Sequence, residues 1–234
     1  MLNGRDVPNP IKYIEVFISN IGEYQHTVYK YIIESINRET KIADFENVDS
    51  FGYVLLEDPI MCLNMVYPNP KFDMEYKDMD KDIDADREQT DDPDGGTKNT
   101  KINYKQMLGI QGLNNVMTYK NQKNPPAKTG FTYKPEILNQ YGRIFSKDKI
   151  GLYSNKIKTI IDEVEGNEGI SLIYSEHIDG GLIPMTLALE EIGFRRFGRN
   201  KSLFSEPLNI NSFISFHFLL LLFFKTLTSA LTPL

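Results

Sequence analysis

Aliphatic residues recur through 154–166 at the spacing of an amphipathic helix. They follow the i, i+3, i+4, i+7 pattern, which places them on one face, and they are Ile157, Ile160, Ile161 and Val164. Ser154 stands where an N-cap is expected, and Gly166 stands where a helix often ends. The pattern therefore predicts a helix over residues 154–166.

A near-continuous apolar run, residues 170–174, follows this helix. Such a run is typical of a parallel strand covered on both faces. A polar, glycine-bearing segment spans 175–181, and a second helix is predicted over 182–192, with Pro184 in its first turn and Gly193 at its end. Residues 194–197 predict a second strand. Helix, strand, helix and strand in this order predict an α/β fold with a right-handed crossover and a parallel sheet.

The remaining pattern is less regular. Alternating β-formers predict a strand over 13–19, and helical spacing predicts an amphipathic helix over 22–37. Residues 51–67 mix apolar positions with Pro59, which indicates a buried, irregular or short-element segment that closes at 68–70, within an α-rich irregular lobe-joining region. Helical spacing returns over 104–120 despite Gly109 and Gly112. An aromatic-rich connector, 131–145, leads into the helix at 154.

The acidic residues of the chain are concentrated in one segment. The chain of 234 residues has a net charge of −6, and residues 71–98 hold eleven Asp or Glu against five Lys or Arg. We therefore interpret 71–101 as a solvated acidic linker. Alternate aspartates over 80–86 resemble a calcium loop, but Ala85 replaces its glycine and Asp91 its final glutamate. Solvated acid is the favoured interpretation, and no metal site is predicted.

The single cysteine, Cys62, lies in an apolar run, which indicates a buried, inert thiol. One cysteine excludes an internal disulfide and fits an intracellular, reducing compartment. The first residues lack the apolar core of a secretion signal. His26 has no ligand-type residue at metal spacing, so we expect a surface histidine.

Three stretches of the block 151–198 carry a family resemblance: YSNKIKTIID, GISLIYS and GLIPMTLALEEIGF. They resemble the start of the second RecA-like lobe of superfamily 2 helicases and Swi/Snf-type translocases. The similarity is greatest to helicases of large nucleocytoplasmic DNA viruses, a group that includes relatives of the poxvirus early transcription factor large subunit. Leu172 to Ser175 would be motif IV. Two upstream stretches, FENVDSFGYVLLEDPIMCLNMVYPN and GFTYKPEILNQYGRIFSKDKIGLYS, are similar to the region joining the two lobes. The resemblance covers roughly residues 10–200; it is diffuse before residue 100 and more specific over 130–198.

The resemblance implies a viral, transcription-related piece of an enzyme that uses ATP and Mg²⁺. No G-x-x-x-x-G-K-[ST] phosphate loop is present, and Arg195, Arg196 and Arg199 do not stand in a motif VI context. Ile161-Asp162-Glu163-Val164 resembles an acidic magnesium box, but these residues complete a helical stripe. We therefore expect no catalytic residue, no cofactor bound by this chain alone and no ATP hydrolysis.

In related lobes the motif IV strand end faces the nucleic-acid backbone. The resemblance therefore implies weak, sequence-independent nucleic-acid contacts by Tyr174, Ser175, His177, Gly180 and Gly181. Basic residues of the preceding helix would add contacts, and these are Lys156 and Lys158. The alternative stays open that Ser175 and Asp179 cap the helix and the two glycines make the turn. The missing lobe or a transcription complex is a further expected partner.

The predicted organisation has five segments: lobe-joining residues 1–70, the acidic linker 71–101, a connector 102–150, the incomplete RecA-like lobe 151–200 and a tail 201–234. The tail is strongly apolar over 213–224. It allows three interpretations: a membrane anchor within 210–234, a core helix, or unrelated sequence after a gene break. The alternative function is a non-enzymatic interaction or membrane-associated protein that works through the acidic linker and the tail.

Overall fold

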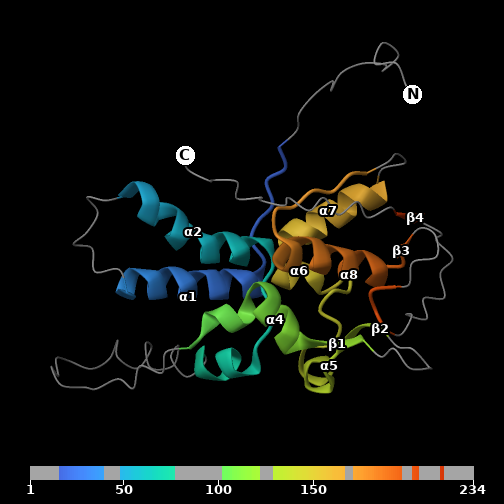
Figure 1. Cartoon of the computed structure of the whole chain (residues 1–234), viewed down its shortest axis with the longest axis horizontal. Helices are drawn as coiled ribbons and strands as arrows, with labels where there is room; N and C mark the ends of the chain where they lie inside the picture. Colours follow the sequence, from blue (N-terminus) through green and yellow to red (C-terminus); the bar gives the residue numbers. More distant parts are fainter. Residues whose placement is uncertain are drawn as a thin grey trace, which may run out of the picture.

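The computed structural model describes residues 16–39, 48–76, 102–121, 129–166, 171–196, 202–205 and 217–218 (Figure 1). The described chain is mostly helical and carries a small two-stranded antiparallel sheet. The acidic run 80–91, the linker beyond residue 76 and nearly all of the apolar tail lie outside these residues. No helix of the described residues is long and apolar enough to cross a membrane.

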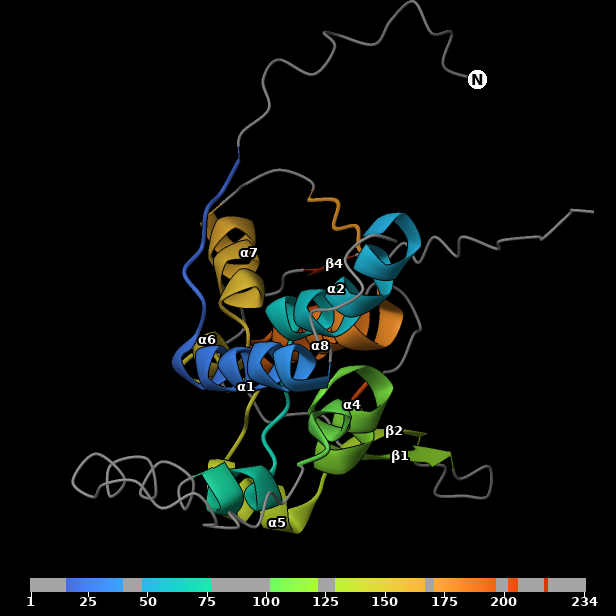
Figure 2. The ribbon, with the colours of Figure 1, turned by 90° about the vertical axis from the view of Figure 1, so that its left-hand side faces the viewer.

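Two long helices form one side of the molecule. Helix α1 spans Glu23–Glu39, as the periodicity predicts, and α2 spans Val48–Asn64 (Figures 1 and 2). The prediction of an irregular or short-element segment over 51–67 is wrong up to residue 64, because α2 is one long helix that continues through Pro59. Proline removes one backbone hydrogen bond and bends a helix, and α2 changes direction along its length in Figure 1. His26 is exposed on α1, as predicted.

The chain leaves α2 in an extended stretch, 65–69, and re-enters a helix at 70–76. The predicted linker therefore begins too early, because residues 71–76 are helical and Phe72 is fully buried. Phe72 packs edge-on against Tyr24 and Tyr31 of α1. These residues belong to a hydrophobic core beneath α1 and α2 that also holds the fully buried Cys62.

Residues 102–133 form a short helical pair and a hairpin. The 3₁₀ helix η2 spans Tyr104–Met107, α4 spans Gly109–Val116, and β1, Met117–Asn121, pairs antiparallel with β2, Thr129–Tyr133. The helix predicted over 104–120 is therefore broken at Leu108 and ends four residues early. Met117 is buried as a strand residue opposite Tyr133 and not as part of the helix.

Helices α5, Pro135–Tyr141, and α6, Ile150–Tyr153, lead into α7, Asn155–Gly166. The predicted helix at 154–166 is confirmed. Ser154 caps it, because its hydroxyl accepts a hydrogen bond of 3.1 Å from the amide of Ile157. The same hydroxyl donates to the carbonyl of Asn64 at the end of α2. Ile161 is buried and Glu163 is exposed, as a helical stripe requires.

The segment after α7 departs from the prediction. Residues 171–175 are extended but pair with no strand of the described chain, and 71% of Leu172 and 65% of Tyr174 are exposed. A buried parallel strand over 170–174 is therefore wrong for the residues described. A π-helical turn, η3, follows at Ile178–Leu182 and runs directly into α8, Ile183–Glu191.

Helix α8 is the most buried helix of the described chain and matches its predicted position. Pro184 stands in its first turn, and Gly193 follows its end with a φ of +112°, a conformation that favours glycine. Strand β3, Arg195–Arg196, pairs parallel with β4, His217–Phe218. The second predicted strand is thus present over two residues.

Residues 202–205 pack on the hairpin. Phe204 forms a parallel bridge with Phe131 of β2 and is buried, and the carboxylate of Glu190 accepts hydrogen bonds from the amide of Leu203 at 2.8 and 3.0 Å. The boundary drawn at residue 201 therefore falls inside packed structure. Among the described residues, parallel pairing is confined to this bridge and to β3 with β4, and no RecA-like parallel sheet is formed.

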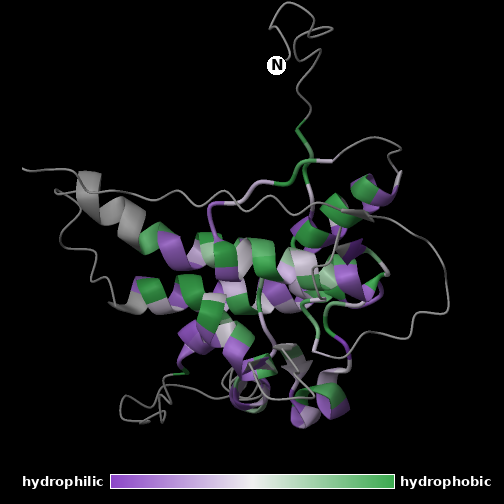
Figure 3. Ribbon diagram, turned by 45° about the vertical axis from the view of Figure 1, so that its right-hand side comes forward, coloured by the Kyte–Doolittle hydropathy of each residue, from purple (hydrophilic) through white to green (hydrophobic). Residues whose placement is uncertain are grey.

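Two hydrophobic cores support these elements. The larger lies between α7, α8, the hairpin and α6, and Tyr24 packs against both cores. Figure 3 shows hydrophobic and hydrophilic residues alternating around α1 and α2, as expected of helices that are buried on one side only. The strand predicted over 13–19 is wrong for its described part, because 16–19 are unpaired and Val16 and Ile18 are more than four-fifths exposed.

Candidate functional site

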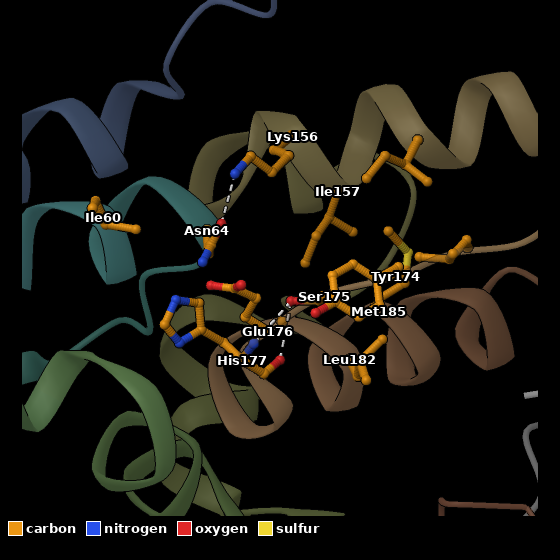
Figure 4. A pocket seen from close by; sticks show the side chains of 13 residues that line it. Ile60, Asn64, Lys156, Ile157, Tyr174, Ser175, Glu176, His177, Leu182 and Met185 are labelled. Atoms are coloured by element: carbon orange, nitrogen blue, oxygen red, sulfur yellow. Dashed lines mark hydrogen bonds between the residues drawn. The ribbon is translucent and has the colours of Figure 1, made fainter. Parts of the chain in front are cut away.

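An open pocket of about 340 Å³ lies where the end of α2, the start of α7 and the segment 173–182 meet (Figure 4). Its volume is at the lower end of the range for small-ligand sites. Most of its wall is aliphatic, contributed by Ile60, Ile157, Ile160, Ile173, Leu182 and Met185. Helices from distant parts of the sequence thus enclose the segment that the sequence singled out.

Polar side chains gather at the mouth of this pocket. They are Asn64, Lys156, Tyr174, Ser175, Glu176 and His177. In Figure 4 Asn64, Glu176 and His177 lie on one side, while Leu182 and Met185 lie on the other. The pocket therefore has a polar end and an apolar end, an arrangement suited to a ligand that is flat or apolar on its faces and polar at its edge.

Five of the seven predicted site residues line the pocket: Lys156, Tyr174, Ser175, His177 and Gly181. The other two do not. Gly180 is buried, and a side chain added there would meet Met61 of α2; Lys158 pairs with Asp162 one turn along α7. Lys158 is thus engaged on another side of the helix, and it serves as a natural comparison for Lys156.

Lys156 is the cationic group of the pocket. Its ammonium donates a hydrogen bond of 2.6 Å to the side-chain oxygen of Asn64 across the mouth. Asn64 is uncharged and half-buried, so a ligand anion that takes its place on the Lys156 ammonium breaks a hydrogen bond to a neutral group and not an ion pair. The position of the lysine is fixed because Ser154, two residues earlier, ties the start of α7 to Asn64.

A short hydrogen-bonded turn presents the loop. The hydroxyl of Ser175 accepts from the amide of His177 at 3.2 Å, so Ser175 shapes the turn before η3. Neither η3 nor α8 has a side-chain cap, so the predicted capping by Asp179 is absent and Ser175 acts on the turn instead. A side chain at Gly181 would lie 2.3 Å from the Ser175 hydroxyl, so glycine is needed for this packing.

The phenol of Tyr67 attaches the loop at residues 175–181 to the core. Tyr67 is fully buried and donates a hydrogen bond of 3.1 Å to the carbonyl of Asp179. Burial, together with the nearby charge of Asp179, raises the pKa of Tyr67 far above its usual range. The phenol therefore stays protonated and remains a donor at every physiological pH, which keeps the loop attached to the core.

The arrangement can bind but shows no catalytic pairing. Ser175 bonds to the backbone of His177 rather than to its ring, so no hydrogen bond joins the hydroxyl to the imidazole as a base. No group of three or more metal-ligating side chains occurs within the described ranges. The polar pocket residues that the sequence did not indicate as site residues are Asn64 and Glu176. Asn64 and the apolar Ile60 come from α2, about 110 residues before the loop.

No protein-family model, no curated protein and no solved structure matches this chain.

Proposed function

We propose that this chain is a non-hydrolysing piece of a helicase- or translocase-type protein whose pocket contacts the backbone of nucleic acid. The phosphate would be bound by Lys156 and by the hydroxyl of Ser175, and such contacts carry no sequence preference. The observation that carries the proposal is the gathering of five residues, chosen from the sequence alone, around one pocket.

The order of elements also supports the family proposal. Helix α7, an extended segment at 171–175, a turn, α8 and the short β3 follow in the order expected for the start of the second lobe. The extended segment lacks a strand partner among the described residues. We propose that a neighbouring strand of a complete lobe would pair with it, and that the incomplete lobe works together with the missing part.

The test is salt-dependent binding of a fluorescently labelled single-stranded oligonucleotide, followed by anisotropy. Lys156→Ala should weaken binding roughly three- to tenfold and lower the slope of log K against log salt by about one, as expected for one lost phosphate contact. Lys158→Ala is the matched control, since Lys158 stands two residues away and pairs with Asp162. Equal losses in the two variants would refute a contact specific to Lys156.

Two further measurements complete this test. Gly181→Ala should weaken binding, because the added methyl displaces the Ser175 hydroxyl, whereas Gly180→Ala should be tolerated, since its methyl would meet Met61 at an ordinary 3.4 Å. The purified chain should turn over no more ATP than a mock preparation. Turnover above that level would contradict the proposal that the chain does not hydrolyse ATP.

A second candidate, a protein-interaction surface, is favoured by one observation on α2. Leu56, Ile60 and Leu63 are between 39% and 52% exposed and recur at i, i+4 and i+7, which makes an apolar stripe beside the pocket. Leu56→Glu should abolish binding to a partner protein without changing affinity for an oligonucleotide. Unchanged protein binding together with weaker oligonucleotide binding in Leu56→Glu would favour the nucleic-acid function alone.

A further inference from the structure

The pocket beside Lys156 holds features that a phosphate contact does not use. Its wall is aliphatic, and Glu176 places a carboxylate at the mouth. A carboxylate repels phosphate and accepts hydrogen bonds from N–H groups. A site for phosphate alone would have neither an apolar interior nor this acid, so the two features call for a second part of the ligand.

We propose that the pocket takes one unpaired nucleobase that bears an exocyclic amino group, while Lys156 holds an adjoining phosphate; this inference rests on the proposed function. The base faces would lie against the aliphatic wall formed by Ile157, Leu182 and Met185. The amino group would donate to the Glu176 carboxylate, the pairing by which acidic side chains read cytosine. A base held in a duplex cannot enter, so the ligand is single-stranded.

The rim of the pocket adds an aromatic platform. Tyr174 is 65% exposed although its neighbour Ile173 packs against the core, so the phenol ring is presented at the mouth. Bases stack on exposed aromatic rings in single-strand sites regardless of their identity. Tyr174 would therefore contribute affinity, while Glu176 would contribute the preference for an amino-bearing base. The two roles are separable by experiment.

The experiment compares labelled oligo(dC), oligo(dA) and oligo(dT) of equal length, and a duplex of that length, by anisotropy at fixed salt. The wild type should prefer oligo(dC) and oligo(dA) to oligo(dT) by roughly five- to tenfold, and should bind the duplex more weakly. Glu176→Ala should reduce this ratio to about one while leaving or raising the affinity for oligo(dT), because a repelling charge is lost. Glu163→Ala, the same charge change on α7 away from the pocket, should keep the ratio.

Tyr174→Ala should weaken all single strands alike by at least about fivefold. Its control is Tyr119→Ala, another exposed tyrosine, 52% exposed on β1. Equal affinity for all three single strands would overturn the base pocket and leave the backbone proposal in place. Binding the duplex as tightly as single strands would also overturn it. No binding of any nucleic acid would overturn both proposals.

Discussion

Replacing Glu190 tests whether residues 202–205 belong to the fold. Its side chain lies on α8 with 6% of the residue exposed, and its carboxylate accepts from the amide of Leu203 at 2.8 and 3.0 Å and from the amide of Phe204 at 3.3 Å. The hydroxyl of Ser202 donates to it as well. One carboxylate thus satisfies the backbone where the chain turns onto β2.

The magnitude follows from which donors keep a partner. In Glu190→Ala the amide of Phe204 retains the Ser202 hydroxyl at 3.1 Å, whereas the amide of Leu203 loses both of its acceptor atoms. Leaving the partly buried amide of Leu203 unsatisfied costs about 1–3 kcal/mol, and the lost hydroxyl bond adds about 1 kcal/mol. Relief from burying a charge offsets part of this cost, so we expect a net loss of roughly 2–3 kcal/mol.

The assay is urea unfolding followed by circular dichroism at neutral pH. Glu190→Gln should lose less than Glu190→Ala, because its side-chain carbonyl still accepts a hydrogen bond from Leu203. Glu57→Ala, at an exposed position of α2, is the control and should change the unfolding free energy by less than about 0.5 kcal/mol. If Glu190→Ala changed stability no more than this control, the packing of 202–205 on the hairpin would be refuted.

Three further predictions concern stability and reactivity. Burial raises the pKa of the Glu191 carboxyl despite its hydrogen bond from Arg143, so the folded state binds this proton more tightly than the unfolded state. The free energy of unfolding should therefore fall as pH rises from the unfolded pKa of about 4.3 through the folded pKa. Glu191→Gln should flatten that decline in urea titrations at several pH values. Gly193→Ala should cost about 1–3 kcal/mol in thermal unfolding because of its positive φ, whereas Gly166→Ala, with open space around it, should cost less than about 0.5 kcal/mol. Burial raises the pKa of Cys62 to about 12, so a thiol reagent should modify it only at the rate of unfolding, and rapid modification of the folded protein would contradict its position in the core.

The elements that the sequence predicted well are those specified by local signals. Helix α7 combines an aliphatic stripe with a serine cap, and α8 combines a proline in its first turn with Gly193 after its end. These features act within a few residues, so they operate wherever the segment lies. Such helices can be predicted from a single sequence because their neighbours do little to change them.

The errors have a common physical cause, which is dependence on a distant partner. Leu172, Ile173 and Tyr174 have the composition of a buried strand, but a strand is buried only when others flank it, and the described chain provides none. Pro59 suggested a break, yet the packing of α2 against α1 outweighs one lost hydrogen bond. Tertiary contacts decided both cases.

In the candidate site, too, the residues found from the sequence belong to a local pattern, and the residues that were missed come from a distant helix. Ser175, His177 and Gly181 were found because they follow one another between an apolar run and a helix, which is a local pattern. Asn64 and Ile60 were missed because they reach the pocket from α2, and nothing in the sequence of that helix marks them as polar or apolar lining. The loop could be predicted from the sequence, but the cavity it faces could not.

The hydroxyl of Ser154 joins two helix ends through a single oxygen, since it donates to the last residue of α2 and accepts from the first turn of α7. Lys156 and Asn64 face each other across the mouth of the pocket, and the helices that carry them, α7 and α2, are both hydrogen-bonded to the Ser154 hydroxyl. Neither helix end can move away from the pocket without lengthening its hydrogen bond to the Ser154 hydroxyl. Ser154 is therefore one of the contacts that hold α2 and α7 together at the entrance, so we expect these two edges of the pocket to move together.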